Sequence, residues 1–323
     1  MEDILQVSEL KKYFKTSSGM LHAVDDVTFS IEEGETLGIV GESGCGKSTL
    51  GRVLIGLLDT TDGQVFYKGK DITSVTKGEK FHLRKEMQMI FQDPFSSLNP
   101  RMSIHDIIAE PLVTHKCCAN KQELERKVSE VMDTVGLASR LRDSYPHELD
   151  GGRRQRVGIG RALALDPRFI VCDEPVSALD VSIQAQILNL MQDLQESKKI
   201  SYTFITHDLS VVKHISHNIL VMYLGCMVEQ CKAEDLFRCQ LHPYTKGLLS
   251  AIPIPKIRRD KKPILLKGEL TSPIDPKPGC RFANRCPYVK ELCRCEVPEY
   301  REVLPSHFVA CHYAEEINGI DKA

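Results

Sequence analysis

The sequence lacks both a strong net charge and any long apolar run, and these absences limit what the chain can bind directly. A formal net charge of −2 over 323 residues gives no electrostatic case for nucleic acid as the main partner. The longest apolar stretch, Ile219–Val228, is far too short to cross a bilayer, and we interpret it as two strands turning at Gly225. The acidic start, Met1-Glu2-Asp3, precedes no apolar segment, so we expect no signal peptide. Any membrane association is therefore expected to come through a partner.

The composition that is present is typical of a globular protein. Hydrophobic residues make up 42% of the chain and charged residues 27%, which supports a core and two or three domains. The 12 cysteines, without a secretory signal, favour a reducing compartment over a disulfide framework.

An octapeptide at residues 41–48 has the composition of a phosphate-binding loop. Its letters, GESGCGKS, match the pattern G-x-x-x-x-G-K-[ST]. Glycines let the backbone curl until N–H groups point at phosphate oxygens, and a following helix offers its positive N-terminus to the same anion. The apolar run Thr36–Val40 predicts a buried strand before the loop, and Ser48–Leu58 has helical spacing after it. We expect Lys47 to reach the β- and γ-phosphates and the Ser48 hydroxyl to bind Mg²⁺. The other loop residues expected to contact the nucleotide are Ser43, Gly44, Cys45, Gly46 and Thr49.

Two further apolar runs end in residues that suit nucleotide hydrolysis. Phe169–Cys172 is followed by Asp173, an acid for the Mg²⁺ site, and by Glu174, which can polarise the attacking water. Tyr202–Ile205 leads to His207, which can donate to the γ-phosphate or orient the water. The alternative for Asp173 and Glu174 is a solvated acidic strand end, and the alternative for His207 is a structural histidine.

Three other residues are candidates on their chemistry. Gln92 follows the apolar run Met87–Phe91, and its amide can both ligate a metal and release it, which suits a sensor. Tyr13 can stack on the adenine, with a buried core tyrosine as the alternative. Cys45 either has a thiol pKa lowered by the helix N-terminus or is a small residue that fits the loop.

The order of elements predicts an α/β fold. Residues 1 to about 90 alternate apolar runs with Gly-rich turns before one helix, residues 100–150 look helical, and residues 155–235 alternate helix and strand. We interpret this as a parallel-sheet core interrupted by a helical insertion. From Ile252 the composition changes: prolines and the basic run Lys256–Lys262, ending at Pro263, predict a solvated linker before a Cys- and Pro-rich tail.

This series of motifs resembles that of an ABC transporter ATPase over residues 4 to about 235. The residues that match its A-loop, Walker A, Q-loop, signature, Walker B, D-loop and H-switch are, in that order, Tyr13, Gly41–Ser48, Gln92, Leu149–Arg153, Asp173-Glu174, Ser177–Asp180 and His207. The resemblance implies an ABC-type P-loop NTPase domain at 1–240, with a RecA-like core and a helical subdomain at about 100–153. It also implies ATP and Mg²⁺ as cofactors, with Ser48 and Gln92 as metal ligands and Glu174 and His207 as catalytic residues.

The tail narrows the resemblance. His242–Thr245, Gly279–Phe282 and Arg285–Pro287 resemble the C-terminal extension of oligopeptide, dipeptide and nickel importers, placed here at 241–323, and the chain looks most like their F-type subunit. This implies a motor subunit of a peptide importer that pairs with a homologous D-type ATPase. Two transmembrane permeases would hold it at the cytoplasmic face of the cell membrane, and an extracytoplasmic binding protein would deliver the substrate.

The signature departs from the family. It reads Leu-Ser-Gly-Gly-Gln in the family and Leu149-Asp150-Gly151-Gly152-Arg153 here. Asp caps a helix about as well as Ser, but its carboxylate has no donor and repels phosphate by several kcal/mol at an effective dielectric of about 20. Arg153 can offset part of this, and Gly151 and Gly152 keep their backbone donors. We therefore expect an asymmetric heterodimer in which the ATP site facing Asp150 is weak.

The tail cysteines form a separate candidate site. Cys280, Cys286, Cys293 and Cys311 have the spacing C-x5-C-x6-C-x17-C, with Cys295 close by. Four thiolates can hold zinc or an iron–sulfur cluster, and the resemblance favours a [4Fe–4S] cluster. The alternative is a small module with unliganded thiols.

Three other functions compete with the peptide importer. A nickel or metal-chelate importer ATPase shares the same tail, and the neighbouring genes would separate the two. A P-loop kinase has no use for the segment at Leu149–Arg153 or for His207. A non-transport ABC protein commonly carries two cassettes or long coiled coils, and this chain shows one cassette and no sustained heptads.

Overall fold

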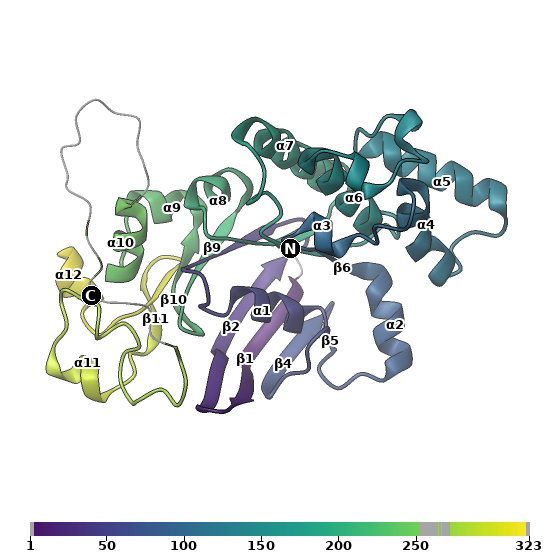
Figure 1. Cartoon of the computed structure of the whole chain (residues 1–323). Coiled ribbons are helices and arrows are strands. Elements are labelled where there is room, and N and C mark those ends of the chain that lie inside the picture. The colour runs from purple at the N-terminus through teal and green to yellow at the C-terminus, as the bar shows by residue number, and fades with distance from the viewer. Residues whose placement is uncertain (1–2, 252–263, 265, 267–271, 321–323) are drawn as a thin grey trace. The chain divides into compact units, whose positions relative to one another are not determined.

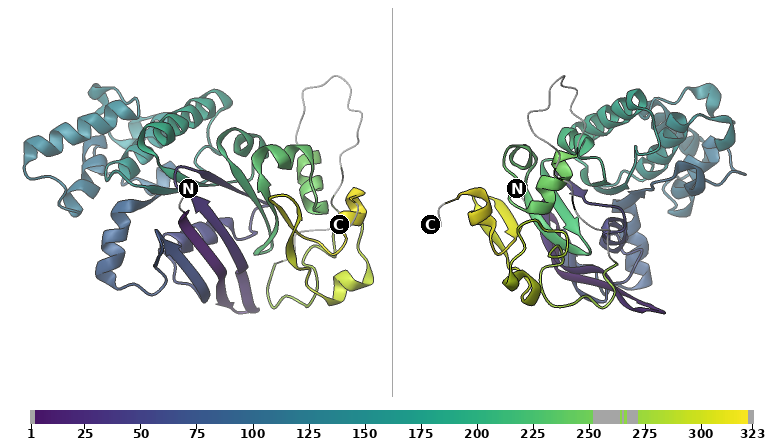
Figure 2. Two further views of the ribbon diagram at one scale, coloured as in Figure 1. Left: turned by 180° about the vertical axis from the view of Figure 1, so that it is seen from behind. Right: turned by 60° about the vertical axis from the view of Figure 1, so that its left-hand side comes forward.

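The structure is a computed structural model, which describes residues 3–251, 264, 266 and 272–320. It confirms the α/β class and divides into two compact units. The helical unit comprises Met1–Ile4, Ile31–Glu35 and Ser74–Ile205, and the P-loop unit comprises Leu5–Ser30, Thr36–Thr73 and Thr206–Ala323. Figures 1 and 2 show the elements of both units. The predicted linker, Ile252–Pro263, lies outside the described residues.

The P-loop unit contains an antiparallel sheet and a run of strands around the P-loop. The antiparallel sheet has the order β2-β1-β4-β5, from β1 Asp3–Thr16, β2 Gly19–Glu32, β4 Asp62–Tyr67 and β5 Lys70–Asp71. The second run has the order β11-β12-β10-β9-β3, from β3 Thr36–Val40, β9 Asn218–Tyr223, β10 Cys226–Lys232, β11 Tyr300–Leu304 and β12 His307–Ala310. β3 pairs with β9 in parallel, whereas β10 pairs with β9 and β12 in antiparallel orientation.

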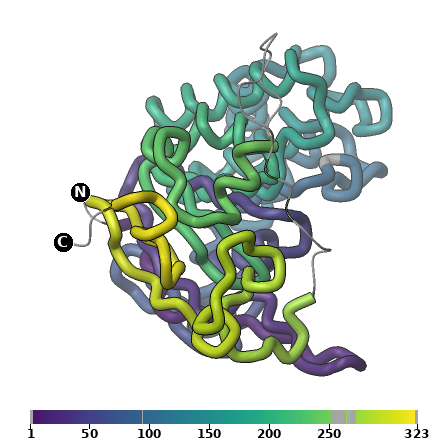
Figure 3. Tube along the Cα trace, turned by 90° about the vertical axis from the view of Figure 1, so that its left-hand side faces the viewer, coloured from purple at the N-terminus to yellow at the C-terminus, as the bar shows by residue number. Residues whose placement is uncertain are grey.

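Six helices of the P-loop unit accompany these strands in its described part. They are α1 Lys47–Leu54, α8 Leu209–Ile215, α9 Ala233–Arg238, α10 Pro243–Ser250, α11 Glu291–Cys295 and α12 Ala314–Asn318. Figure 3 shows the C-terminal trace, in yellow, folded against the strands of this unit, where β12 extends the sheet beside β10. A core cluster joins Val40 and Val221 of the strands to Tyr244 of α10 and Phe282 of the tail, so the tail packs on the body of the unit.

The helical unit places helices around three parallel strands. The strands are β6 Met87–Ile90, β7 Phe169–Asp173 and β8 Ser201–Thr206, and β7 and β8 are buried along their full length. The helices are α2 Lys77–Glu86, α3 Pro94–Ser97, α4 Ile104–Thr114, α5 Lys121–Thr134, α6 Gly151–Leu163 and α7 Val181–Lys198, with 3-10 turns at Ser139–Leu141 and Pro146–Glu148. Helices α4, α5 and α6 pack on one another, which confirms the predicted helical insertion (Figure 1).

Most predicted elements are present, with two corrections. Strands form at Thr36–Val40 and Phe169–Asp173, and the stretch Ile219–Val228 is a strand, a turn and a strand. The helix after the P-loop ends at Leu54 rather than at Leu58. A second helix, α2, follows it before residue 90, where the sequence predicted only one. Among the described residues, no helix has the length and apolar character needed to cross a membrane.

Candidate functional site

The P-loop, Gly41–Ser48, connects the buried strand β3 to helix α1, as its sequence predicts. Two of its glycines are required by close backbone approaches. A Cβ on Gly41 would lie 2.2 Å from the carbonyl oxygen of Met222, and one on Gly46 would lie 1.9 Å from that of Ala23. Both glycines also have positive φ, at 155° and 105°, where L side chains are strained. The loop is thus a glycine-dependent cradle at a helix N-terminus, which is the geometry that binds phosphates.

Lys47 lies folded across the first turn of this cradle. Its Nζ donates to the carbonyl oxygens of Gly41 at 2.7 Å and of Glu42 at 3.0 Å, and the residue is 5% exposed. A buried ammonium at this place favours an anion. Beside it, burial raises the pKa of the Cys45 thiol, so the idea of a lowered pKa is wrong and Cys45 serves as a small residue that fits the loop.

Tyr13 lies in β1 and stacks on a histidine. The rings of Tyr13 and His22 are 3.9 Å apart at 24°, and the Tyr13 hydroxyl donates to Asp25. Burial raises the pKa of Tyr13, and the bond to Asp25 raises it further. The hydroxyl is therefore fixed and protonated, and stacking of this ring on adenine stays a prediction.

The acidic end of β7 lies in the helical unit with the predicted glutamine. Asp173 is 2% exposed, and Gln92 Nε2 donates to Glu174 Oε2 at 3.0 Å. Glu174 has a positive φ of 47°, and its N–H donates to the carbonyl oxygen of Ile205 at 2.9 Å. The structure thus brings Gln92 and Glu174 together. His207 follows β8 in an exposed position, and its role in hydrolysis remains a prediction, as do those of Asp173 and Glu174.

The predicted signature forms the start of α6. Asp150 is the N-cap, because its Oδ1 accepts from the Arg153 N–H at 2.8 Å. The Arg153 side chain pairs with the same carboxylate, with Nε 3.4 Å from Oδ2, and both side chains are about half exposed. Gly152 is packed so closely that a Cβ there would meet Ile183 Cγ2 at 2.7 Å. Asp150 therefore caps the helix as serine would, and Arg153 offsets its charge.

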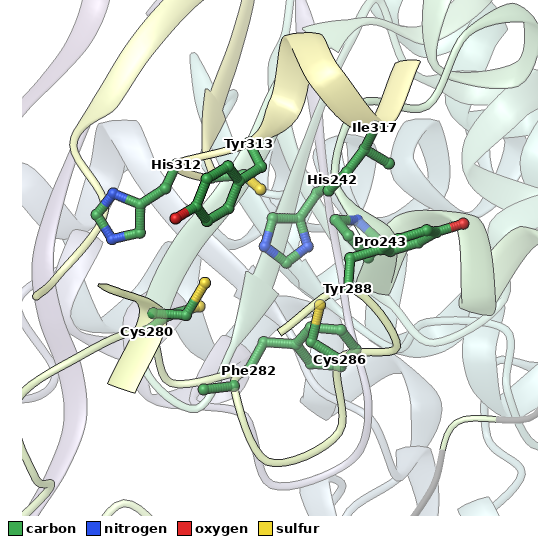
Figure 4. Close-up of a pocket in the computed structure, with 12 residues that line it drawn as sticks. His242, Pro243, Cys280, Phe282, Cys286, Tyr288, His312, Tyr313 and Ile317 are labelled. Carbon is green, nitrogen blue, oxygen red and sulfur yellow. The ribbon is translucent and has the colours of Figure 1, made fainter. Parts of the chain in front are cut away.

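The four predicted tail cysteines surround one small pocket. Cys280, Cys286, Cys293 and Cys311 line it together with His242 and Phe282 (Figure 4), and its volume of about 20 Å³ is about that of one water probe. Burial raises the pKa of Cys280 to about 12 and that of Cys311 to about 11, and the neighbouring thiols add to both shifts. Within the described residues, no group of three or more His, Cys, Asp or Glu side chains is arranged to hold a metal ion. The metal prediction at these cysteines therefore gains no support from the geometry.

Two arginines of the tail pair with carboxylates of the P-loop unit, one of them in the P-loop itself, and no sequence motif predicts either pairing. Arg281 pairs with Asp25, and its Nη1 donates to the carbonyl oxygen of Leu224 at 2.5 Å. Arg285 donates to both carboxylate oxygens of Glu42, from 243 residues further along the chain. In the sequence, both arginines flank predicted cysteine ligands and lie in segments that resemble the importer extension, and neither feature indicates their partners.

A glycine cradle between a parallel strand and a helix, with a lysine folded into it and a second strand ending in acids, defines a P-loop NTPase. The ABC transporter family matches residues 24–177, and the oligopeptide/dipeptide transporter C-terminal region matches residues 228–293.

Individual relatives agree with these matches. The oligopeptide transport ATP-binding protein AppF of Bacillus subtilis is 52% identical over 322 residues, which span 96% of this chain and 97% of the relative. The oligopeptide transport ATP-binding protein OppF of Salmonella typhimurium is 50% identical, over 95% of each chain. The solved dimer of the ATP-binding cassette MJ0796, in a post-hydrolysis state with ADP and Pi, is similar with a TM-score of 0.66 and 27% identity, over 71% of this chain and 98% of that one.

The chain belongs to the ABC transporter ATP-binding proteins that carry the oligopeptide/dipeptide transporter C-terminal region. Its activity is ATP hydrolysis coupled to transport.

Proposed function

We propose that the chain is the ATP-hydrolysing motor subunit of an importer of oligopeptides or dipeptides. The observation that carries the proposal is the P-loop cradle with its buried Lys47, in a chain that aligns almost end to end with oligopeptide transport ATP-binding proteins. We assign residues 1–240 to the nucleotide-binding domain, with its helical subdomain at about 100–153, and residues 241–323 to the extension. Two permeases would hold the subunit at the cytoplasmic face of the membrane, and an extracytoplasmic binding protein would supply the peptide.

The site residues fit ATP and Mg²⁺ on their chemistry. The glycine positions at Gly41 and Gly46 leave the loop no room for a Cβ, as a backbone cradle for phosphate requires. Lys47 and Ser48 would bind the phosphates and the metal, with Gln92 as a second metal ligand. Bound Mg²⁺ would neutralise charge on the phosphates, and the other loop contacts would come from Ser43, Gly44, Cys45, Gly46 and Thr49.

The pair of Gln92 and Glu174 indicates how the chain would activate water. Glu174 would accept a proton from the attacking water, and the bond from the Gln92 amide fixes one oxygen of that carboxylate. Asp173, buried at the end of β7, would support the metal, and His207 would contact the γ-phosphate. Gln92 would sense the nucleotide because it binds the metal and also donates a hydrogen bond to Glu174, the proposed general base.

Substitution of Lys47 tests this function directly. We expect Lys47→Ala to lower the ATPase activity of the assembled importer by about a hundredfold or more, because no other group in the loop replaces its ammonium. Lys290→Ala is the control, since the hydrogen bonds described for Lys290 join it to Glu316 and not to the P-loop. Wild-type ATP binding and hydrolysis by the Lys47→Ala importer would contradict the proposal.

We also propose that the subunit works as a heterodimer with a homologous D-type ATPase and that one of the two ATP sites is weak. What supports this is the signature, in which Asp150 offers a carboxylate where the family offers a serine hydroxyl. Its pairing with Arg153 reduces the repulsion of phosphate but supplies no hydroxyl donor. The site facing Asp150 would therefore hydrolyse ATP slowly.

For the tail cysteines, we propose that the pocket lined by Cys280, Cys286, Cys293 and Cys311 binds a [4Fe–4S] cluster. What supports it is the ligand chemistry alone: cysteine thiolates are the ligands that iron–sulfur clusters, and next zinc, prefer, and the geometry of the described residues adds nothing to it. Iron analysis and the visible spectrum of the full chain, purified without oxygen, test it. Stoichiometric iron with broad visible absorption supports the cluster. A colourless protein with zinc, or with no metal, overturns it.

A further inference from the structure

The tail of the chain holds the first turn of the P-loop through a salt bridge. Arg285 Nη1 and Nη2 lie 2.5 Å and 3.0 Å from the two carboxylate oxygens of Glu42, the residue directly after the first glycine of the loop. The Arg285 side chain is 9% exposed and that of Glu42 28%, so the pair is largely screened from water. A bidentate arginine–carboxylate pair fixes orientation as well as distance. The side chain of Glu42 is thus tied to the C-terminal extension.

The backbone of Glu42 is held by the same region. Its N–H donates to the hydroxyl of Tyr244 at 2.8 Å. Tyr244 is fully buried, packs edge-on against Tyr223 with ring centroids 4.7 Å apart, and contacts Phe282 at a tilted angle with centroids 5.5 Å apart. The Arg285 guanidinium lies over the ring of Tyr223 at 5.9 Å. Buried aromatic rings with few rotamers form a stiff support, so Tyr244 and Arg285 reach Glu42 from one rigid cluster.

Lys47 holds the same turn from inside the loop. Its Nζ donates to the carbonyl oxygens of Gly41 and Glu42. To bind phosphate, Lys47 has to exchange these two bonds for phosphate oxygens. The turn then keeps the backbone bond from the Cys45 N–H to the Glu42 carbonyl oxygen, at 3.3 Å, and the side-chain support that Glu42 receives from Arg285 and Tyr244. These two residues therefore hold the turn when its own lysine turns to the ligand.

We propose that Arg285 is a positioning residue for ATP: it fixes Glu42, and with it the P-loop turn, in the conformation that receives the phosphates. The inference rests on the proposed nucleotide site at the P-loop. It makes the C-terminal extension part of the ATP site of its own chain, because a residue beside the cysteine pocket sets how well the loop is organised in advance. A P-loop turn that already has its binding conformation raises the affinity for ATP, because less conformational entropy is lost when ATP binds.

The test compares KM and kcat for ATP in the assembled importer. Arg285→Met keeps the apolar stem over Tyr223 but removes both donors. We expect it to raise KM for ATP about tenfold, as loss of a charged hydrogen bond does, and to change kcat less than about twofold. Arg301→Met is the matched control, because Arg301 forms a comparable pair with Glu315 in the same extension, 2.6 Å from Nη1 to Oε1. The control should keep the wild-type KM.

A double variant distinguishes two causes of a raised KM for ATP: loss of the positioning contact and the uncompensated charge of Glu42. Arg285→Met leaves the Glu42 carboxylate uncompensated near the phosphates, which alone would weaken ATP binding. The double variant E42Q/R285M removes both charges, so positioning predicts that KM stays raised. A return to the wild-type KM in the double variant, or a wild-type KM in Arg285→Met, overturns the proposal.

Two further variants complete the test. If Arg285→Met does not fold, Glu42→Gln decides, since it keeps Arg285 and one acceptor. A KM raised about threefold supports positioning, and a wild-type KM overturns it. Lys47→Ala separates the two proposals: if it loses ATP binding while Arg285→Met keeps the wild-type KM, only the role of Arg285 fails.

Discussion

At the scale of single residues, Asp25 gathers donors from segments that are far apart in the sequence. The Tyr13 hydroxyl, His22 Nδ1 at 3.0 Å and the Arg281 guanidinium all lie against its carboxylate. Burial acts to raise the pKa of Asp25, but the bonds from Tyr13 and His22 and the charge of Arg281 outweigh it and lower the pKa below 3.8. Asp25 thus joins the predicted A-loop tyrosine to the C-terminal extension.

This arrangement predicts a pH-dependent loss of stability. Because the folded pKa of Asp25 lies below the unfolded value of 3.8, its contribution is present above pH 3.8 and is lost as the pH falls further. We expect Asp25→Asn to be about 1–2 kcal/mol less stable than wild type at pH 7, with a smaller difference at pH 3. Denaturant unfolding at both pH values measures this. A difference that does not change with pH would contradict the assignment.

The sequence could predict residues whose role depends on near neighbours. Lys47 was identified by the loop around it, and Asp150 was expected to cap α6, which it does through Arg153 N–H three positions on. The sequence could not predict that Arg285 pairs with Glu42, because the two residues are 243 positions apart and meet only through the way the tail folds back. Contacts between near neighbours can be predicted from the spacing of residues in the sequence, whereas contacts between distant residues depend on the packing of the folded chain.

At the scale of elements, one buried carboxylate joins the tail to the central strands of its unit. Glu229 of β10 is fully buried and accepts from the N–H groups of Leu241 and His242, at 2.7 Å and 3.0 Å. His307, at the start of β12, lies 2.7 Å from the same carboxylate through Nε2. The pairing of β10 with β12 is therefore reinforced by two buried side chains, those of Glu229 and His307.

Loss of this carboxylate should loosen the tail. We expect Glu229→Gln to lower the free energy of unfolding by about 3 kcal/mol, because the amide nitrogen would face N–H donors and leave buried groups unpaired. Glu302→Gln is the control, since Glu302 on β11 is exposed and accepts only from Ser306 N–H among its described bonds, and its change should stay within about 0.5 kcal/mol. Urea unfolding measures both. Equal stability of Glu229→Gln and wild type would show that the buried Glu229 carboxylate does not stabilise the fold.

The strands that the sequence predicted are those with an unbroken apolar run. β7 and β8 are buried on both faces, so their residues read as continuous apolar strands. Helix α2 was missed because it buries none of its residues and leaves no periodic signal. Its start depends on a capping box between Thr76 and Glu79. β11 and β12 were missed because they are short and only partly apolar.

At the scale of the whole molecule, the chain is an ABC ATPase whose signature lacks the family serine. Since Asp150 and Arg153 satisfy each other, the helix start is sound as structure, and the expected deficit is confined to chemistry at the partner's nucleotide. Substitutions at Asp150 are therefore expected to change activity more than stability.

Restoring the family signature tests the asymmetry. We expect the double substitution Asp150→Ser and Arg153→Gln to raise ATP turnover at the site that faces this signature, because a hydroxyl donor replaces a carboxylate. Single-turnover measurements with the partner's own P-loop lysine intact or replaced assign turnover to each site. If the restored importer hydrolyses ATP at the original rate while both sites turn over, the sites were never unequal.

The most direct test of the account is peptide uptake by the importer reconstituted in vesicles. We expect labelled oligopeptide or dipeptide to enter only with ATP, and we expect Lys47→Ala in this chain to abolish uptake while Lys290→Ala leaves it unchanged. Uptake of a nickel chelate in place of peptide would move the assignment to a metal importer. Peptide uptake that persists at the wild-type rate with Lys47→Ala would contradict the claim that this chain is the motor.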